Sequence, residues 1–444
     1  MTQVLTAPRE RTRKTGALAR HADLFTNAGS LMGTTVVTSG LGFVYWWLAA
    51  RSATPEAVGQ ASAAVAAMTL IGTIGMFGMG TMLISELPRM TTRRWNLIST
   101  CLLLAGSAAT VGGLGYVLLA SVAVPGLRGA LGPPAATVLL VFGITLNAIT
   151  LVLDEAMIGL LAGPLQLLRN VYFAVGKLLL LGLLVLLPVT ITGSQLLLTW
   201  VAGAVLSVAL LSFAVRRRRM VSSLRPIPAM LRGKARLAFD HNLLNMALYL
   251  PRASLPLVVT AVLTTRDTAA FYTAYMVMAF VAMIPANIAL TLFAVASGDR
   301  AALRSKVRMG LLISFGLGVP ASLVLVFAAH PIMSIFGAEY AVTAGDTLAL
   351  LALAYVPMVF QQFFLAISRV LGRVRRAGAL YVLAGLIEVA AAIYGGTRGS
   401  LTELMLWLVA VFVLEGVLMA PTVLRVAFSR LAPTPGAPAE QSAP

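Results

Sequence analysis

The chain has 444 residues, of which 59% are hydrophobic and only 11% are charged. Soluble domains carry about 25% charged residues, so this composition excludes a soluble globular protein and indicates a polytopic membrane protein. The net charge of +18 would suggest nucleic-acid binding in a soluble protein. Here the cations lie in short connections beside apolar segments, where they meet anionic lipid. We therefore predict membrane lipids as partners and no nucleic acid.

Regularly spaced apolar segments run along the whole chain, and each can cross a bilayer core, which needs about 20 residues. The sequence predicts an all-α membrane protein with twelve transmembrane helices. In chain order, the predicted spans are 27–50, 57–84, 97–124, 135–160, 168–188, 195–215, 241–263, 268–297, 307–330, 343–368, 378–396 and 402–424.

The basic residues favour one side of these segments. The predicted cytoplasmic connections hold most of the cations, and Arg169 is counted among them, in the connection between the fourth and fifth spans. The opposite connections hold only Arg51, Arg128, Arg266 and Arg398. Because positive charge is retained on the cytoplasmic side, both termini are predicted to be cytoplasmic.

The longest internal polar stretch separates the spans into two sets of six. The predicted parts are a basic cytoplasmic tail, a six-helix bundle, a basic cytoplasmic linker, a second six-helix bundle and a disordered cytoplasmic tail, at 1–26, 27–215, 216–240, 241–424 and 425–444. Asn27 and Arg51 recur as Asn242 and Arg266 at the same offset of 215 residues. This indicates two pseudo-symmetric halves around a central cavity, unless the matches are those that any twelve-span chain would show.

Several enzyme classes are disfavoured by the sequence. The predicted external connections are too short for a polymerase or glycosyltransferase domain, and no G-x-x-x-x-G-K-[ST] loop for ATP occurs. His21, His241 and His330 are too far apart for a zinc site, and Cys101 is the single cysteine. We expect no catalytic residue, no cofactor and no metal.

Arg252 is the leading candidate for contact with substrate. It lies between Pro251 and Pro256 in the seventh predicted span, about 15 Å from the start of that span. Prolines disturb a helix because they remove backbone donors, and a cation in a broken helix at mid-depth suits an anionic ligand group such as a phosphate. The alternative is a kink whose arginine pairs with a neighbouring carboxylate.

Asp154 and Lys177 lie at similar predicted depths in consecutive spans, so we expect a structural ion pair between them. In the functional alternative, Lys177 binds substrate and Asp154 takes part in ion or proton coupling. Glu155 points about 100° away from Asp154 on the same helix and is expected to reach the cytoplasmic interface.

Glu388 and Glu415 fall at mid-depth in the last two spans and are the main candidates for ion or proton coupling. A carboxyl group inside the membrane can carry a proton during alternating access. Arg252 could instead hold one of them ionised, with no coupling role.

Polar residues in the middle of other spans are candidate substrate contacts, and we name Asn287 and Gln361. Hydrogen bonding between helices is the commoner reason for such residues. The tryptophans near span ends are expected to be interfacial anchors; they are Trp46, Trp47 and Trp95.

Several short motifs resemble polysaccharide flippases of the multidrug/oligosaccharidyl-lipid/polysaccharide exporter superfamily. They are Asn27-Ala28-Gly29-Ser30-Leu31, Leu48-Ala49-Ala50-Arg51, Thr54-Pro55-Glu56-Ala57-Val58-Gly59-Gln60-Ala61-Ser62, Leu83 to Arg89, Asp154 to Gly159, Arg169-Asn170, Lys177-Leu178, Leu255-Pro256-Leu257 and Ala270-Phe271-Tyr272. The resemblance implies two six-helix bundles around a central cavity. It also implies movement of a lipid-linked saccharide, with its headgroup in the cavity and its polyprenyl tail in the bilayer.

We therefore predict a multi-pass protein of the bacterial plasma membrane. Its predicted function is that of a flippase or exporter of a polyprenyl-linked oligosaccharide for envelope polysaccharide synthesis, working by alternating access. A polysaccharide polymerase and glycosyltransferases are expected partners. The alternatives are a cation-coupled multidrug exporter of the same superfamily and a membrane component of a polysaccharide assembly complex.

Overall fold

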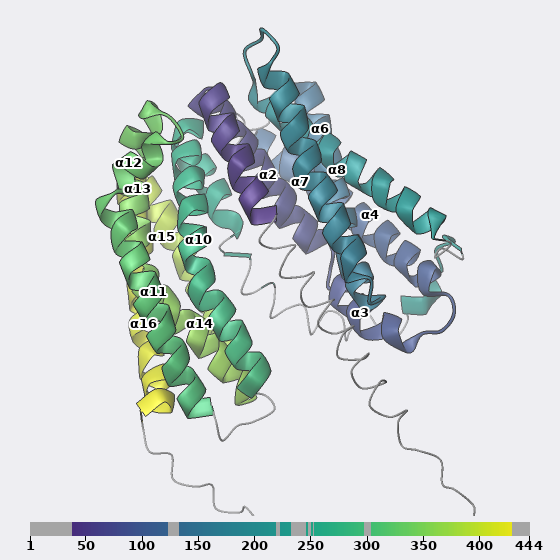
Figure 1. Cartoon of the computed structure of the whole chain (residues 1–444). Coiled ribbons are helices and arrows are strands. Elements are labelled where there is room, and N and C mark those ends of the chain that lie inside the picture. The colour runs from purple at the N-terminus through teal and green to yellow at the C-terminus, as the bar shows by residue number, and fades with distance from the viewer. Residues whose placement is uncertain are drawn as a thin grey trace, which may run out of the picture. The chain divides into compact units, whose positions relative to one another are not determined.

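The computed structural model describes residues 38–122, 133–218, 223–231, 253–296 and 303–428, together with Met246, Leu250 and Pro251. The predicted tail 1–26 lies outside these residues, as do Arg252 and parts of the linker 216–240 and the tail 425–444. Within the described ranges the chain is helical, and the one β-type pairing there is an isolated bridge between Ala53 and Ile191 (Figure 1).

The first part of the chain forms a helical stretch over residues 38–52 and then the following elements: α2 (Pro55–Gly75), α3 (Met79–Glu86), η1 (Leu87–Arg89), α4 (Arg94–Val122), α6 (Pro134–Gly159), α7 (Gly163–Val185), α8 (Gly193–Arg217), η2 (Pro228–Leu231) and the helix Ala253–Val262. The remaining elements are α10 (Thr265–Ala296), α11 (Leu303–Phe327), α12 (Ala329–Ser334), α13 (Ala338–Leu353), α14 (Tyr355–Val370), α15 (Val374–Gly396) and α16 (Leu401–Phe428).

Nine of the described helices are long and apolar enough to cross a membrane, and the bent pair α13 and α14 brings the number to ten if it counts as one span. The protein is therefore a multi-pass membrane protein. The predicted spans 27–50 and 241–263 are described only over residues 38–50 and, apart from three single residues, 253–263. The total of twelve thus stays a prediction.

Two predicted spans are not continuous helices. The span 57–84 breaks between α2 and α3, where Phe77 and Gly78 have φ angles of 43° and 73°. Only glycine adopts this left-handed region without strain, which favours a break at Gly78. The span 343–368 bends by 47° between α13 and α14. Pro357 lies in the first turn of α14, where a missing backbone donor costs least.

The contacts divide the chain into two compact units. Unit 1 comprises Met1–Tyr272 with Ile335–Gly337, and unit 2 comprises Thr273–Ser334 with Ala338–Pro444. The division falls within α10, after the predicted linker 216–240. That predicted boundary stays a prediction, because residues 219–222 and 232–240 lie outside the described part.

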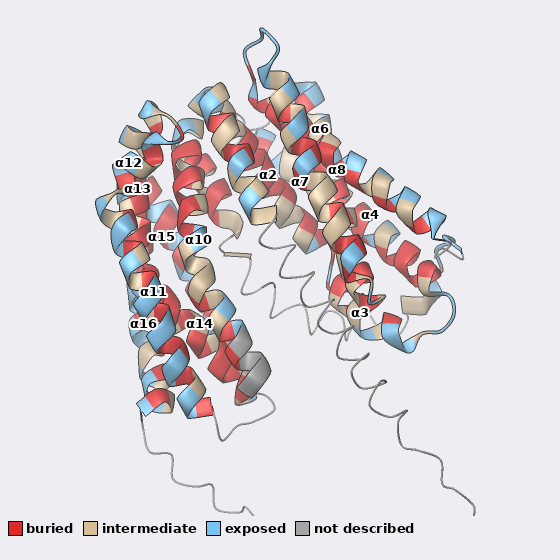
Figure 2. Ribbon diagram, in the orientation of Figure 1, coloured by how far each residue is buried: buried red, intermediate tan, exposed pale blue. Residues whose placement is uncertain are grey.

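Each unit is a helix bundle with its own buried interior (Figure 2). In unit 1, α7 packs against α8, α4 against α6, and α2 against α6. In unit 2, α16 packs against α14 and α15, and α11 against α13. Large apolar side chains remain on the outside of both units; Phe327, for example, is 84% exposed. Such a surface is favourable in lipid and unfavourable in water.

Candidate functional site

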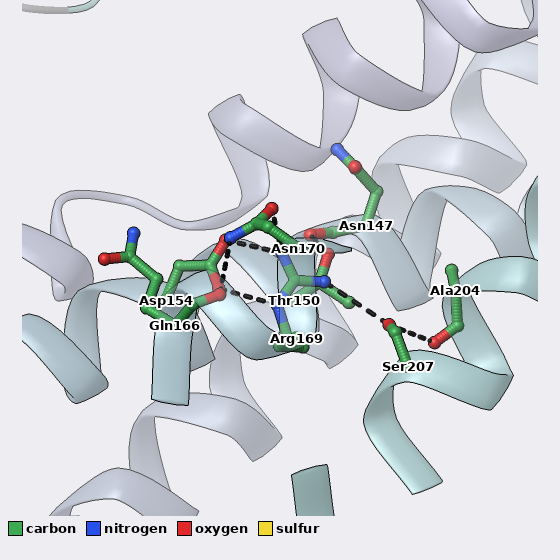
Figure 3. A network of polar contacts seen from close by, with 8 residues as sticks. All are labelled: Asn147, Thr150, Asp154, Gln166, Arg169, Asn170, Ala204 and Ser207. Carbon is green, nitrogen blue, oxygen red and sulfur yellow. Dashed lines mark hydrogen bonds and ion pairs between the residues drawn. The ribbon is translucent and has the colours of Figure 1, made fainter. Parts of the chain in front are cut away.

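A largely buried ion pair joins α6 to α7 in unit 1 (Figure 3). Nε and Nη2 of Arg169 donate to Oδ1 and Oδ2 of Asp154, each over 2.6 Å. A two-pronged guanidinium–carboxylate pair is charge-assisted and fixes the angle between its partners. The expected pair between Asp154 and Lys177 is therefore wrong, because Arg169 occupies the carboxylate.

The surrounding side chains complete the network. Nη2 of Arg169 also donates to Oδ1 of Asn170 over 2.8 Å, and the Asn170 amide donates to Asp154 over 3.3 Å. Nη1 reaches Oγ of Ser207 on α8 at 3.5 Å. The network thus connects three helices, α6, α7 and α8, beside the turn that joins the first two.

Arg169 was predicted to lie in a cytoplasmic connection, and this placement is wrong. It lies in the second turn of α7 and is only 4% exposed. Gly163-Pro164 was the missed signal, because proline favours the first turn of a helix and places the start of α7 well before Arg169.

Lys177 lies two turns further along α7, enclosed by aromatic rings. Its Nζ atom is 3.4 Å from the ring centroid of Trp200, 4.7 Å from that of Phe173 and 5.0 Å from that of Tyr45. The side chain is 4% exposed, and no described carboxylate forms an ion pair with it. We call Lys177 with Tyr45, Phe173 and Trp200 the aromatic cage.

Further rings extend the aromatic cage toward α10. Trp46 packs on Trp200 with the ring centroids 5.6 Å apart, and on Tyr272 of α10 at 4.9 Å. The Tyr45 hydroxyl donates to the Leu196 carbonyl over 3.0 Å. Trp46 is 2% exposed and Trp95 is also buried, so the expectation that they are interfacial anchors is wrong.

The two predicted coupling carboxylates are both buried in unit 2. Nε2 of Gln361 on α14 donates to Oε2 of Glu415 on α16 over 2.8 Å. The Tyr381 hydroxyl on α15 donates to the Gln361 carbonyl over 2.6 Å. Glu388 lies seven residues after Tyr381, which places both on one face of α15. The predicted Gln361, which is fully buried, thus contacts a carboxylate of its own unit.

A cavity of about 190 Å³ lies between α10 and α14 in unit 2. This is far above the ~10–15 Å³ that a single water needs. Its polar lining is Gln362 and Arg369, two turns apart on α14, and the remaining walls are alanine and leucine side chains. The predicted contact Asn287 is an exposed residue of α10, next to the lining residue Ala286. Sequence reasoning had placed Arg369 in a cytoplasmic connection, whereas it lies in the last turn of α14.

One predicted substrate contact, Arg252, has not yet been placed. Arg252 lies outside the described residues, so its predicted contact stays a prediction. No group of three or more histidine, cysteine or acidic side chains in the described ranges is arranged to hold a metal ion.

The fold is similar to those of solved transporters. A lipid II flippase, MurJ, in an inward closed conformation matches with a TM-score of 0.68 and 12% identity over 89% of each chain. An inward-facing multidrug resistance MATE family transporter of the MOP superfamily matches with a TM-score of 0.62 and 13% identity over 89% of this chain and 96% of that one. A MOP superfamily transporter from Pyrococcus furiosus matches with a TM-score of 0.53 and 14% identity over 92% of this chain and 95% of that one.

None of the curated proteins compared with the sequence matches it. A family model described as "Polysaccharide biosynthesis protein" matches residues 24–292, which is more than half of the chain. The match covers α2 to α8 and most of α10, and so includes the Asp154–Arg169 network and the aromatic cage. The chain therefore belongs to the polysaccharide biosynthesis protein family, as the resemblance of its motifs predicted.

Proposed function

We propose that the protein is a flippase or exporter that moves a polyprenyl-linked oligosaccharide across the bacterial plasma membrane by alternating access, for envelope polysaccharide synthesis. In this proposal the chain crosses the membrane twelve times, both termini are cytoplasmic, and the protein is not an enzyme. Membership of the polysaccharide biosynthesis protein family and a fold similar to a lipid II flippase support it. A polymerase and glycosyltransferases would be its partners.

The observation that carries the proposal is the cavity between α10 and α14. A guanidinium forms paired, charge-assisted hydrogen bonds to a phosphate, and a side-chain amide can bind a phosphate or sugar oxygen. Arg369 and Gln362 offer these groups, and the alanine and leucine walls offer an apolar surface beside them. This combination suits the junction of a lipid chain and its phosphate.

The other predicted contacts keep their roles in the proposal unless their surroundings favour another. Arg252 and Asn287 remain candidate substrate contacts. Gln361 is better suited to holding Glu415, to which it donates a hydrogen bond. Glu388 and Glu415 remain the candidate coupling carboxylates, whereas Asp154 is better suited to a structural role because Arg169 binds both of its oxygens.

A reconstitution experiment tests the proposal. Purified protein in liposomes should exchange a fluorescent polyprenyl diphosphate saccharide between leaflets, measured by quenching of the outer leaflet. Arg369→Met should lower the initial rate about tenfold or more, because a hydrogen bond to a charged group contributes about 1.5–3 kcal/mol.

The matched control is Arg373→Met, which removes the same charge from an exposed position at the start of α15. It should leave the rate unchanged. Equal rates for wild type and empty liposomes would remove the flippase proposal, and extension of the glycan by the purified protein would show enzymatic activity instead.

A cation-coupled multidrug exporter is the second candidate, favoured by the two buried carboxylates of unit 2 and by the similarity to a MATE family transporter. In that case Glu415→Gln should abolish efflux of a cationic dye from cells, while Arg369→Met should have no effect on it. The flippase proposal expects no dye efflux from wild type.

A further inference from the structure

The aromatic rings around Lys177 offset only part of the free energy that its ammonium loses on leaving water. An ammonium that leaves water loses several kcal/mol of hydration, and an ion pair with a carboxylate is the usual interaction that offsets this loss. Lys177 is buried among three rings, and the described residues offer it no carboxylate within ion-pair distance. A cation over an aromatic face recovers about 0.5–2 kcal/mol. The charged form therefore depends on the rings staying where they are.

The charged groups around the aromatic cage are few and lie at a distance. On α7 the next charge is Arg169, eight residues or about 12 Å away, and it is bound to Asp154 of α6. α8 has no charged residue before Arg216, and residues 38–52 hold only Arg51, six residues after Tyr45. The remaining titratable groups on residues 38–52, α2, α4, α6, α7, α8 and α10 are Tyr45, Glu56, Arg94, Cys101, Tyr116, Glu155, Tyr172, Arg217, Arg266, Asp267, Tyr272 and Tyr275. Of these, only Tyr45 has its ring within 5.0 Å of the Lys177 ammonium in the contacts described.

The aromatic cage is connected by packing to the helix that belongs to both units. Lys177 contacts Trp200, Trp200 packs on Trp46, and Trp46 packs on Tyr272. Tyr272 is the last residue of unit 1 on α10, and the same helix continues into unit 2 from Thr273. A rearrangement of the rings around Lys177 would therefore change the packing of Tyr272 and so act directly on α10.

Close packing of α7 against α8 holds the lysine in place. A Cβ atom on Gly203 of α8 would lie 2.9 Å from the Lys177 backbone nitrogen and 2.9 Å from its Cβ. The Lys177 backbone is thus pressed against α8, so the side chain has little freedom to leave the rings without a movement of the helices.

We propose that Lys177 binds and releases the proton whose movement drives transport. On one side of the cycle the Nζ lone pair takes a proton from water and the ammonium is held by the rings. On the other side the rings separate, an N–H bond breaks, the proton passes to water and the neutral amine remains. The proposal rests on the transport function proposed above, and it assigns to Lys177 a role that differs from substrate contact.

The first test needs no substrate, because Trp200 lies against the ammonium and reports its charge. Tryptophan emission of the full chain in lipid nanodiscs is measured from about pH 5 to pH 10. Wild type should show one titration, and Lys177→Met and Trp200→Phe should each lose it. Lys306→Met, which removes a lysine from α11 far along the chain from the aromatic cage, should keep it.

The second test measures coupling. With one proton moved per substrate, a gradient of about one pH unit should raise the steady-state accumulation of the fluorescent polyprenyl diphosphate saccharide up to about tenfold. Lys177→Met and Lys177→Arg should show the same accumulation with and without the gradient, because arginine does not give up its proton. Elution as a single species shows that each variant is folded.

The outcomes separate the two proposals. A wild type without an emission titration, or a Lys177→Met variant that keeps the titration or the response to the gradient, overturns the role of Lys177 while leaving transport intact. A wild type that titrates but moves no saccharide removes the proposed function and leaves proton binding at Lys177 standing.

Discussion

Replacing Arg169 with alanine is expected to lower the free energy of unfolding by about 3–5 kcal/mol, since it leaves the largely buried Asp154 carboxylate without its cation. The guanidinium supplies two hydrogen bonds of 2.6 Å to that carboxylate and also contacts Asn170 and Ser207. The loss is measured by unfolding in mixed detergent micelles as a function of the SDS fraction. The variant should also yield less monodisperse protein.

A double variant separates the cost of leaving Asp154 unpaired from the net contribution of the ion pair to stability. Replacement of a buried ion pair by apolar residues of similar volume is often neutral or favourable, because neither charge then has to leave water. Asp154→Leu combined with Arg169→Met should therefore recover most of the stability that Arg169→Ala loses. If Arg169→Ala unfolds at the same SDS fraction as wild type, the pair contributes little and our account of the network is wrong.

The spans were predictable from the sequence because length and apolar composition decide whether a helix can cross a membrane. Which polar side chains pair with one another inside the bundles could not be predicted in the same way. Asp154 and Lys177 were matched by depth alone, which does not say which faces meet. A helix that is apolar on all sides carries no periodic signal for its buried face. The choice of Arg169 over Lys177 therefore depended on packing that one sequence does not reveal.

The candidate site shows the same limit. Burial of Glu388 and Glu415 followed from their depth in the spans, and both are buried. The bond from Gln361 to Glu415 joins α14 to α16 across 54 residues, and no local spacing predicts it. The break at Gly78 and the bend before α14 were also missed, because glycine and proline are common in membrane helices and only some of them interrupt one.

α2 and α10 approach each other closely at Gly59, so a substitution at this position is expected to have a large effect on stability. Gly59 belongs to a motif that resembles the flippase family, and the structure supplies a physical reason for a glycine there. A Cβ atom at this position would overlap the carbonyl oxygen and carbon of Thr265, at the start of α10. Because these are backbone atoms, no rotamer change can relieve the overlap, and the two helices would have to move apart.

Gly59→Ala is therefore expected to destabilise unit 1 by about 1–3 kcal/mol, the usual range for overpacking, even though alanine favours a helix more than glycine does. Gly115→Ala is the matched control, because it adds the same methyl group to α4 with no atom within 4 Å. There the gain in helix propensity should act alone and leave the protein as stable as wild type or up to about 1 kcal/mol more stable. Both are measured by the same SDS unfolding. Since α10 continues from unit 1 into unit 2, Gly59→Ala should slow saccharide exchange as well. If Gly59→Ala and Gly115→Ala are equally stable, α2 can move away from Thr265 at no cost in free energy, and this prediction is wrong.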